Sequence, residues 1–592
     1  VLDCGEGRLA YELAKATELK IIGVEADAAK VAAAREAIDK AGLYGRVVIH
    51  HRSSNKLAYT KYFANLIVSD RMLRTGEMPA SPKELFGLVR PSGGVIALGV
   101  PTAKNNKEEL KKWGQAAIAG WKVRKHGKVH WGLAKRASLE GAGEWTHIHA
   151  EPGNSACSND TIVKGPMAIQ WFGRPGAERM IDRHHRNMPP LYKNGRLFVP
   201  GDCVVFGVDA YNGTIQWEVE IPKSRRLGVF LDSGSMAVDE KLLYVVAEDK
   251  CYGFDVDTGG RRLTHTMPQL IKDQPRQWGY IAYTGDVLLG SGRRKDASYT
   301  QTSYDADDAL WRRNMKLVVS DYVFAMNKTT GEPLWKYRDG LIINTTITVG
   351  GPRPDPRGGR MYFIESTSPT ALADELGRMP AKTLFDGGEQ HLVALKIKTG
   401  RVVFKKKIDV SYFSEPVYLN YAKGVVLLSG SDLVGRSIRY YYDAFEGRRG
   451  RPLWSVSHDT NLAPDGGHGE YNRHPTIVDD VVYAWPYAYN IKTGEKLSGW
   501  EMDRRGHGCG GVSASAQCLF WRGLNPWMYD LGAGEPGPAG GAARLTSVTR
   551  PGCWINIIPA GGLVLVPEAS SGCTCGFSVQ TSMAFVPKEA LN

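Results

Sequence analysis

The sequence predicts a multidomain protein in which a Rossmann-like α/β domain precedes an all-β propeller. The first observation behind this prediction is the alternation of short apolar strands with helix-like stretches over residues 1–137. The second is a turn motif, Asp or Asn followed four residues later by Gly and then by an aromatic residue, that recurs over residues 166–592. Alternating strands and helices are typical of a parallel doubly wound sheet, and repeated hairpin units of a propeller.

The first 137 residues carry the elements of the α/β domain. Strands are expected at residues 1–3, 21–24, 47–49, 64–68 and 95–98. A helix with Leu9, Leu13 and Ala16 on its apolar side follows the first strand, and further helices are expected at 28–41 and 82–89. Residues 121–124 and 131–134 are candidates for a final hairpin, and residues 138–165 are expected to form a linker.

Residues at the expected strand ends resemble the class I S-adenosylmethionine (SAM)-dependent methyltransferases. Asp3, Gly5 and Gly7 match the D-x-G-x-G of the first motif, Glu25 ends the second strand, and Asp70 follows the fourth. The resemblance implies that the glycines allow the backbone to approach the methionine part of SAM at a helix N-terminus. It also implies that Glu25 binds the ribose hydroxyls, so these five residues are the predicted SAM site.

Two departures from the methyltransferase pattern predict a degenerate cofactor site. Leu9 stands where many members of the family have a third glycine. After the third strand the sequence continues His50-His-Arg-Ser-Ser54, without the acid that usually meets the adenine amine.

The turn motif of the second domain occurs seven times. Its copies begin at Asp209, Asp255, Asn327, Lys396, Asp443, Asn490 and Asp530. Most intervals are near the size of one four-stranded blade, roughly 40–50 residues. Residues 167–202 and 562–588 can complete a further blade by pairing the two ends of the domain. We therefore expect about eight four-stranded blades, with seven as the alternative.

The repeated A-x-D-x-x-T-G-x-x-x-W pattern resembles the blades of the pyrroloquinoline quinone (PQQ)-type propellers, the quinoprotein alcohol dehydrogenase-like superfamily. This superfamily contains oxidoreductases and also non-enzymatic outer-membrane assembly lipoproteins. The resemblance implies a periplasmic or otherwise exported location. It leaves PQQ open as a cofactor, because the motif holds blades together in catalytic and non-catalytic members alike.

Glycine-rich loops of the second domain carry histidine and cysteine residues that the blades do not need. In a propeller, loops from different blades converge on a funnel, where imidazole and thiolate groups suit zinc, copper or iron. The candidate metal ligands are His184, His185, His468, His474, His507, Cys509, Cys573 and Cys575. The alternatives are ordinary loop histidines and, for the cysteines, structural disulfides.

A quinone enzyme of this type also needs a calcium or lanthanide ion held by oxygen ligands, and an aromatic floor beneath the quinone. The side chains nominated for these roles are Asp305, Glu470, Asn472 and Trp554.

The formal net charge of +13 is concentrated at the start of the chain. The first 140 residues hold 24 Lys and Arg against 14 acids, with dense patches at 104–112 and 122–128. A contact with an anionic surface is therefore possible. Nucleic acid is disfavoured, because aromatic residues are not interleaved with these charges along the sequence. We expect a small-molecule or protein partner at the propeller rim.

The chain contains no apolar run long enough to span a bilayer. Its first residues read as the middle of a strand, so we expect the natural protein to begin earlier and a leader to be invisible here.

Three function classes follow. We favour a redox or metal/quinone function in the propeller funnel. The alternatives are a non-catalytic binding or scaffold propeller, and a SAM-dependent methyltransferase whose propeller recognises the substrate.

Overall fold

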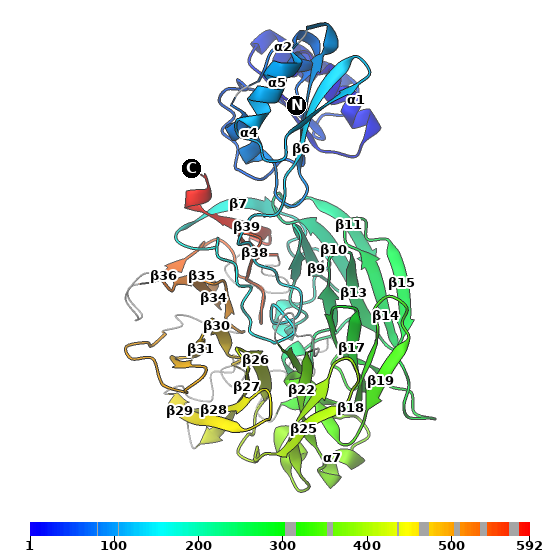
Figure 1. Cartoon of the computed structure of the whole chain (residues 1–592), viewed down its shortest axis with the longest axis vertical. Helices are drawn as coiled ribbons and strands as arrows, with labels where there is room; N and C mark the ends of the chain where they lie inside the picture. The colour runs from blue at the N-terminus through cyan, green and yellow to red at the C-terminus, as the bar shows by residue number, and fades with distance from the viewer. Residues whose placement is uncertain are drawn as a thin grey trace. The chain divides into compact units, whose positions relative to one another are not determined.

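The computed structural model describes residues 1–79, 81–104, 106–301, 315–351, 359–434, 437–460, 473–502, 510–532, 541–567 and 579–591. The chain divides into two compact units (Figure 1). The front unit comprises Val1–Glu140 with Glu589–Asn592, and the propeller unit comprises Gly141–Lys588.

The front unit contains the predicted parallel sheet. Its named strands are β1 (Ile21–Glu25), β2 (Val47–His51), β3 (Leu66–Ile67), β4 (Val95–Pro101), β5 (Lys122–His126) and β6 (Val129–Lys135). The pairs β1–β2 and β3–β4 are parallel, and backbone bonds from Leu2 to Val68 and from Val24 to Val1 place residues 1–3 between β1 and β3. The hairpin β5–β6 adds to β4 in antiparallel fashion. The predicted Rossmann-like fold and final hairpin are both confirmed.

Three of the five helices of the front unit were predicted: α1 (Arg8–Ala16), α2 (Ala28–Lys40) and α4 (Pro82–Leu88). The helix α2 begins because the Asp27 side chain accepts hydrogen bonds from the backbone of Ala29 and Lys30. The helices α3 (Asp70–Thr75) and α5 (Lys107–Gln115) were not predicted. The sequence of α5 is rich in charged residues, and its buried residues are Leu110 and Gly114.

The propeller unit consists of antiparallel sheets of three or four strands. The first three sheets contain β8–β11 (Leu191–Lys193, Arg196–Pro200, Val204–Asp209, Ile215–Glu220), β12–β15 (Met236–Val238, Leu242–Ala247, Lys250–Asp255, Arg261–Thr266) and β16–β19 (Gln277–Thr284, Val287–Arg293, Lys316–Asn327, Pro333–Tyr337). The next two contain β21, β22, β24 and β25 (Thr348–Gly350, Arg360–Ser366, Gln390–Lys396, Val402–Lys407) and β26–β29 (Tyr418–Ala422, Val425–Val434, Ser437–Glu446, Pro452–Thr460). The last three contain β30–β32 (Thr476–Val478, Val481–Ala484, Tyr487–Asn490), β33–β36 (Ser513–Ala514, Cys518–Gly523, Asn525–Asp530, Ala542–Arg544) and β37–β39 with β7 (Ile558–Ala560, Leu563–Val566, Ser582–Pro587, Met167–Gly173).

Two features connect these sheets. The strand β20 (Leu341–Ile343) pairs with both β18 and β22, so two neighbouring sheets merge into one of ten strands that also includes β23 (Arg378–Pro380). The strand β7, from the start of the unit, pairs with β39, from its end. The predicted pairing of the two ends is therefore present, and the colours in Figure 1 run around the unit from cyan to red.

Neighbouring sheets are held together by an aromatic side chain of one sheet packed on the turn glycine of the next. Trp335 donates its indole N–H to the carbonyl of Ile397 at 2.6 Å, and a Cβ added to Gly400 would lie 2.6 Å from its ring. The same contact joins Trp171 to Gly213, Trp217 to Gly259 and Trp454 to Gly494, while Phe404 lies on Gly450 and His265 on Gly331. The aromatic side chains Trp217, Trp335 and Phe404 are buried by this contact.

The copy of the motif predicted at residues 443–447 is displaced. Asp443 lies inside β28, where its carboxylate accepts hydrogen bonds from Tyr412 and Ser455. The turn lies at Glu446–Gly450 instead, because Gly450 donates to the Glu446 carbonyl at 2.8 Å and has a φ of 69°. With the turn at Gly450, the aromatic Trp454 follows the glycine by four residues, as Trp217 follows Gly213 and Trp335 follows Gly331.

The segment expected to be a linker is an integral part of the propeller unit. We call residues 141–165 the inner segment; in Figure 1 its cyan chain runs inside the ring of sheets. Its carbonyl groups accept hydrogen bonds from backbone N–H groups in the first strands of successive sheets. The donors are Tyr192, Val238, Val349, Tyr421, Ile477 and Ala514. The Asn154 side chain also donates to the carbonyls of Ile347 and Leu419 at 3.0 and 3.1 Å.

We expect Gly400→Ala to destabilise the propeller unit by about 2–4 kcal/mol. A non-glycine residue in the left-handed region costs about 1–2 kcal/mol, and overlap with the Trp335 ring adds a similar amount. The matched control is Gly424→Ala, because Gly424 has a φ of 85° but no atom within 4 Å of the added Cβ. Urea unfolding followed by tryptophan fluorescence measures both, and equal losses would contradict the proposed role of the contact.

Candidate functional site

The loop after the first strand of the front unit has the geometry of a glycine-rich cofactor loop. Gly5 and Gly7 have φ values of 55° and 86°, a region that glycine adopts without strain. A Cβ added to Gly7 would lie 3.2 Å from that of Ala34, and one added to Gly5 would lie 3.2 Å from the Arg74 guanidinium. The backbone conformation therefore favours glycine at both positions, and an added Cβ would be in tight contact at each.

The carboxylate of Glu25 faces this loop from the end of β1. Its Oε2 accepts a hydrogen bond from the Gly5 backbone N–H at 2.8 Å, and its Oε1 accepts from Ala26 and Asp27 at 2.9 and 3.1 Å. The side chain is buried, with the residue 9 % exposed. A carboxylate has about four acceptor positions, so one position on Oε2 is left for a ligand hydroxyl.

Two arginines of α3, Arg71 and Arg74, form ion pairs with carboxylates beside this loop. Asp70 begins this helix, and its Oδ2 lies 3.3 Å from Nη2 of Arg74. Burial raises the pKa of the Asp70 carboxyl, the positive charge of Arg74 opposes this, and the charge of Glu25 adds to it. Arg71 lies 3.3 Å from the Asp3 carboxylate. The structure thus gathers Asp3, Gly5, Gly7, Glu25 and Asp70 around one loop; the arginines were missed, although the Asp70–Arg74 spacing is that of a helical ion pair.

The end of β2, where the family pattern has an acid, is aromatic and basic instead. His50 Nδ1 lies 2.5 Å from the Tyr59 hydroxyl, and the two rings are stacked. The Arg52 guanidinium lies 5.3 Å from the centre of the Tyr59 ring and donates to the carbonyl of Leu57. Guanidinium groups only donate hydrogen bonds, so Arg52 suits the ring nitrogens of adenine but not its amine.

The propeller unit contains a second buried constellation, here called the aromatic cluster. It comprises His149, Arg186, Phe230, Tyr418, His474 and Trp554. The imidazoles of His149, from the inner segment, and His474 stack with ring centres 3.8 Å apart and planes within 9°. Burial lowers the pKa of His474 to about 3. Burial, and then the neighbouring His474, lower the pKa of His149 well below its usual value. Both rings are therefore neutral.

A small cavity of about 20 Å³ adjoins this cluster, enough for about one water molecule. Its lining includes His149, Tyr280, Asn344 and the fully buried Asp232, which accepts a hydrogen bond from the Asn344 amide at 2.8 Å. The Tyr280 hydroxyl and His149 Nδ1 make no hydrogen bond to the described part of the chain. A single water molecule could satisfy both groups.

The predicted metal ligands are only partly brought together. His474 lies in the aromatic cluster, whereas His184 pairs with Asp182 at 2.7 Å and His185 is buried beside Arg186. Five candidates lie outside the described residues: His468, His507, Cys509, Cys573 and Cys575. Within the described ranges, no three His, Cys, Asp or Glu side chains lie close enough to hold a metal ion.

Of the nominated quinone-site residues, Trp554 lies in the aromatic cluster, and Asp305, Glu470 and Asn472 are not described. His149 lies in the segment expected to be a linker and was assigned no role from the sequence. Its stacking partner is over three hundred residues away, so no local pattern could have identified the pair.

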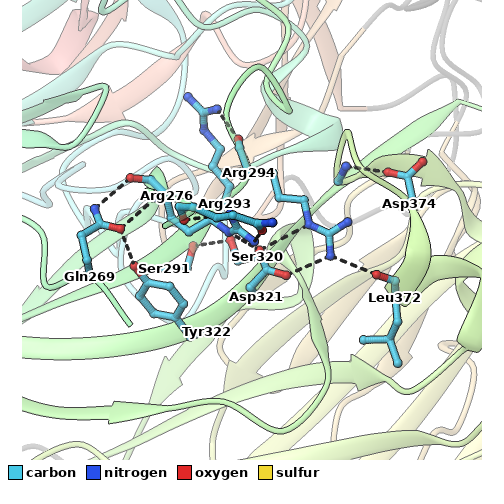
Figure 2. Close-up of polar contacts among 12 residues, drawn as sticks. Gln269, Arg276, Ser291, Arg293, Arg294, Ser320, Asp321, Tyr322, Leu372 and Asp374 are labelled. Carbon is cyan, nitrogen blue, oxygen red and sulfur yellow. Dashed lines mark hydrogen bonds and ion pairs between the residues drawn. The ribbon is translucent and has the colours of Figure 1, made fainter. Parts of the chain in front are cut away.

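The insertion at residues 365–390 is anchored by a buried carboxylate rather than by a ligand site (Figure 2). Asp321 accepts hydrogen bonds from Arg276 Nε at 2.5 Å and from Arg294 Nη2 at 3.0 Å. Arg294 also donates to the carbonyl of Leu372, within α7 (Pro369–Ala373). This network fixes the insertion to β18.

Comparison with known proteins distinguishes the two units. Residues 1–151 match a family model described as a methyltransferase domain. The front unit is a methyltransferase-type domain. Among solved structures, a putative S-adenosyl-L-methionine-dependent methyltransferase from Methanococcus maripaludis is 17% identical, with 23% of this chain and 76% of that chain covered and a TM-score of 0.20.

Two propellers are also similar to this chain. The quinohemoprotein alcohol dehydrogenase from Comamonas testosteroni is 11% identical, with 75% of this chain and 80% of that chain covered and a TM-score of 0.43. BamB from Moraxella catarrhalis is 15% identical, with 56% and 78% covered and a TM-score of 0.31. A search of curated proteins finds no match to the sequence. No described helix is long and apolar enough to cross a membrane.

We expect acid to destabilise the propeller unit through the stacked histidines. Histidine in an unfolded chain has a pKa of about 6.5, whereas that of buried His474 is about 3. Burying neutral His474 therefore contributes fully to the free energy of unfolding above about pH 6.5, and this contribution is lost as the pH falls toward 3. At about pH 4.5 the loss for this residue is about 3 kcal/mol. Calorimetric Tm values at pH 7 and 4.5 measure it.

The variant His474→Phe keeps an aromatic ring but cannot be protonated, so its Tm should fall less with pH than that of the unmodified protein. The control His184→Asn removes a histidine outside the cluster and should leave the pH dependence unchanged. An unaltered pH dependence in His474→Phe would contradict the assignment.

Proposed function

We propose that the methyltransferase-type domain binds SAM and transfers its methyl group, with the propeller unit presenting the substrate. The observation that carries this proposal is the position of Glu25, whose buried carboxylate holds the Gly5 N–H and keeps one acceptor position toward the loop. Bound SAM would supply an electrophilic methyl group on a sulfonium.

The side chains around the loop suit the charges of SAM. Arg74, 60 % exposed beside Gly5, is placed to pair with the methionine carboxylate, and Asp70 or Asp3 with its ammonium group. Glu25 would accept a hydrogen bond from a ribose hydroxyl. The aromatic and basic surface at Tyr59 and Arg52 would meet the adenine ring by stacking and by donation to its ring nitrogens.

Isothermal titration of the full chain with SAM tests this proposal. We expect Glu25→Ala to weaken binding about 10- to 100-fold, because a hydrogen bond to a charged group contributes about 1.5–3 kcal/mol. The control Gly45→Ala changes a glycine of the same domain with a φ of 94° and no atom within 4 Å of the added Cβ, and should bind normally. Absence of binding to the unmodified protein at millimolar SAM would overturn the proposal.

A second candidate function is a redox or metal centre in the propeller funnel. It is favoured by the position of His474 in the aromatic cluster, stacked on His149, whose ring in turn contacts Trp554. Parallel stacked rings direct their lone pairs along parallel lines, so only one of His149 and His474 would serve as a ligand. Copper, iron, zinc or calcium would then depend on ligands from residues 461–472, 503–509 and 568–578.

The described residues do not form a pocket for PQQ beside this cluster. The cavity there holds about 20 Å³, whereas pockets for ligands of this size enclose about 300–1,000 Å³. The imidazole of His474 favours a metal ion as the redox cofactor, and PQQ stays a prediction from the propeller resemblance.

The two candidates predict different metal contents and compartments. A metal centre predicts stoichiometric metal in protein purified from its native source, and suits the periplasmic or exported location implied by the propeller resemblance. Methyl transfer predicts a metal-free protein in the compartment that contains SAM. Mass-spectrometric metal analysis with cell fractionation separates the two, and metal lost with His474→Phe would favour the metal centre.

A further inference from the structure

The hairpin β5–β6 brings basic and aromatic side chains together that the sequence keeps apart. Its register pairs Lys122 with Leu133, Arg124 with Trp131 and His126 with Val129. Directly opposite residues of an antiparallel pair lie on the same face, about 5 Å apart. We call this face the hairpin face; its members are Lys122, Arg124, His126, Val129, Trp131 and Leu133.

The opposite face of the hairpin is covered by the protein's own core. A Cβ added to Gly132 would meet the Trp121 ring at 2.0 Å, and Val123 packs on the same core as Leu110 of α5. Because side chains alternate along a strand, Lys122 and Arg124 point away from this core. Trp131 lies on their side, with its ring near Gly99 and Leu73.

The hairpin face is exposed and its charge is uncompensated. Lys122, Arg124 and His126 are all exposed, while Val129, Trp131 and Leu133 are half-buried. Neither Lys122 nor Arg124 forms an ion pair with any described residue, and the same holds for Lys128 at the hairpin turn. A basic face without acidic partners attracts polyanions.

We propose that the hairpin face binds single-stranded nucleic acid. Side chains two residues apart on a strand are spaced about 6.8 Å, a reach that lets Lys122 and Arg124 contact successive phosphates of an extended strand. The half-exposed Trp131 ring beside Arg124 offers a stacking surface for a base. Sheet faces that combine aromatic and basic side chains are a common platform for single strands.

An anionic bilayer fits this face less well. Membrane-inserting hairpins carry apolar residues at the tip, whereas this tip reads His126-Gly127-Lys128 and is entirely exposed. The apolar residues Val129, Trp131 and Leu133 lie on the strand behind this tip and are half-buried.

The hairpin lies at a functionally relevant edge of the sheet. Val129, next to the turn, pairs with Pro101 at the carboxyl end of β4. The carboxyl ends of the parallel strands also carry Gly5, Glu25 and Asp70, and ligands of open α/β sheets bind at this edge. Nucleic-acid binding does not require SAM, so this inference stands or falls independently of methyl transfer.

Fluorescence anisotropy of the full chain with a fluorescein-labelled 20-nucleotide oligo(U) and oligo(dT) tests the inference without SAM. We expect binding that weakens roughly tenfold between 50 and 200 mM salt, for about two to three phosphate contacts. The variant Trp131→Ala should bind about tenfold more weakly, and Trp131→Phe should retain most of the affinity. Thermal unfolding of both variants shows whether they are folded.

A charge-matched pair of variants localises the site. Lys122→Gln with Arg124→Gln should reduce binding and flatten its salt dependence, whereas Lys111→Gln with Lys112→Gln removes the same charge from α5 and should not. Equal losses in the two pairs would overturn the inference. So would equal binding of a 20-base-pair duplex, or binding to phosphatidylserine vesicles without binding to either oligonucleotide.

Discussion

The contact between an aromatic ring and the turn glycine of the next sheet is the interaction on which the propeller unit depends. A single sheet of three or four short strands cannot bury both faces, so each must be covered by its neighbour. The indole ring of Trp335 covers the bare backbone at Gly400, and its N–H satisfies the Ile397 carbonyl. The contact recurs at six junctions between neighbouring sheets in the described part of the unit, and the pairing of β7 with β39 joins the two ends of the unit.

The inner segment follows from that arrangement. Buried backbone N–H and C=O groups need hydrogen-bond partners. The N–H groups of the first strands find theirs in the carbonyl groups of the inner segment. The segment meets them in chain order, from Tyr192 to Ala514, and thereby delivers His149 against His474. Neutral stacked imidazoles and, among the described residues, a cavity for about one water molecule are the result.

Local sequence patterns were sufficient to predict the fold, but not the contacts between segments that are distant in sequence. Strand and helix periodicity and the methyltransferase loop could be read from the sequence because each depends on neighbours within about twenty residues. The turn assigned to Asp443 was misplaced because the determining contact, Phe404 on Gly450, joins different sheets. The inner segment shows no helical or strand periodicity in its sequence, because its conformation depends on hydrogen bonds to residues that are distant in sequence, such as Ile347 and Leu419. Arg71 and Arg74 were overlooked because α3 has only six residues.

Electrostatics gives the front unit a specific chemical preference. The first 140 residues carry a formal net charge of +10, out of +13 for the whole chain. Within this basic unit, the three carboxylates of Asp3, Glu25 and Asp70 nevertheless lie around one loop. Carboxylates that are this close are stable as anions only with cations nearby, and α3 supplies two arginines. SAM, the ligand proposed above, carries an ammonium and a sulfonium beside a carboxylate, so the proposal rests on the mixed charges of this loop. The single-stranded nucleic acid proposed for the hairpin face is a polyanion, so the two proposed ligands of the front unit differ in their charge.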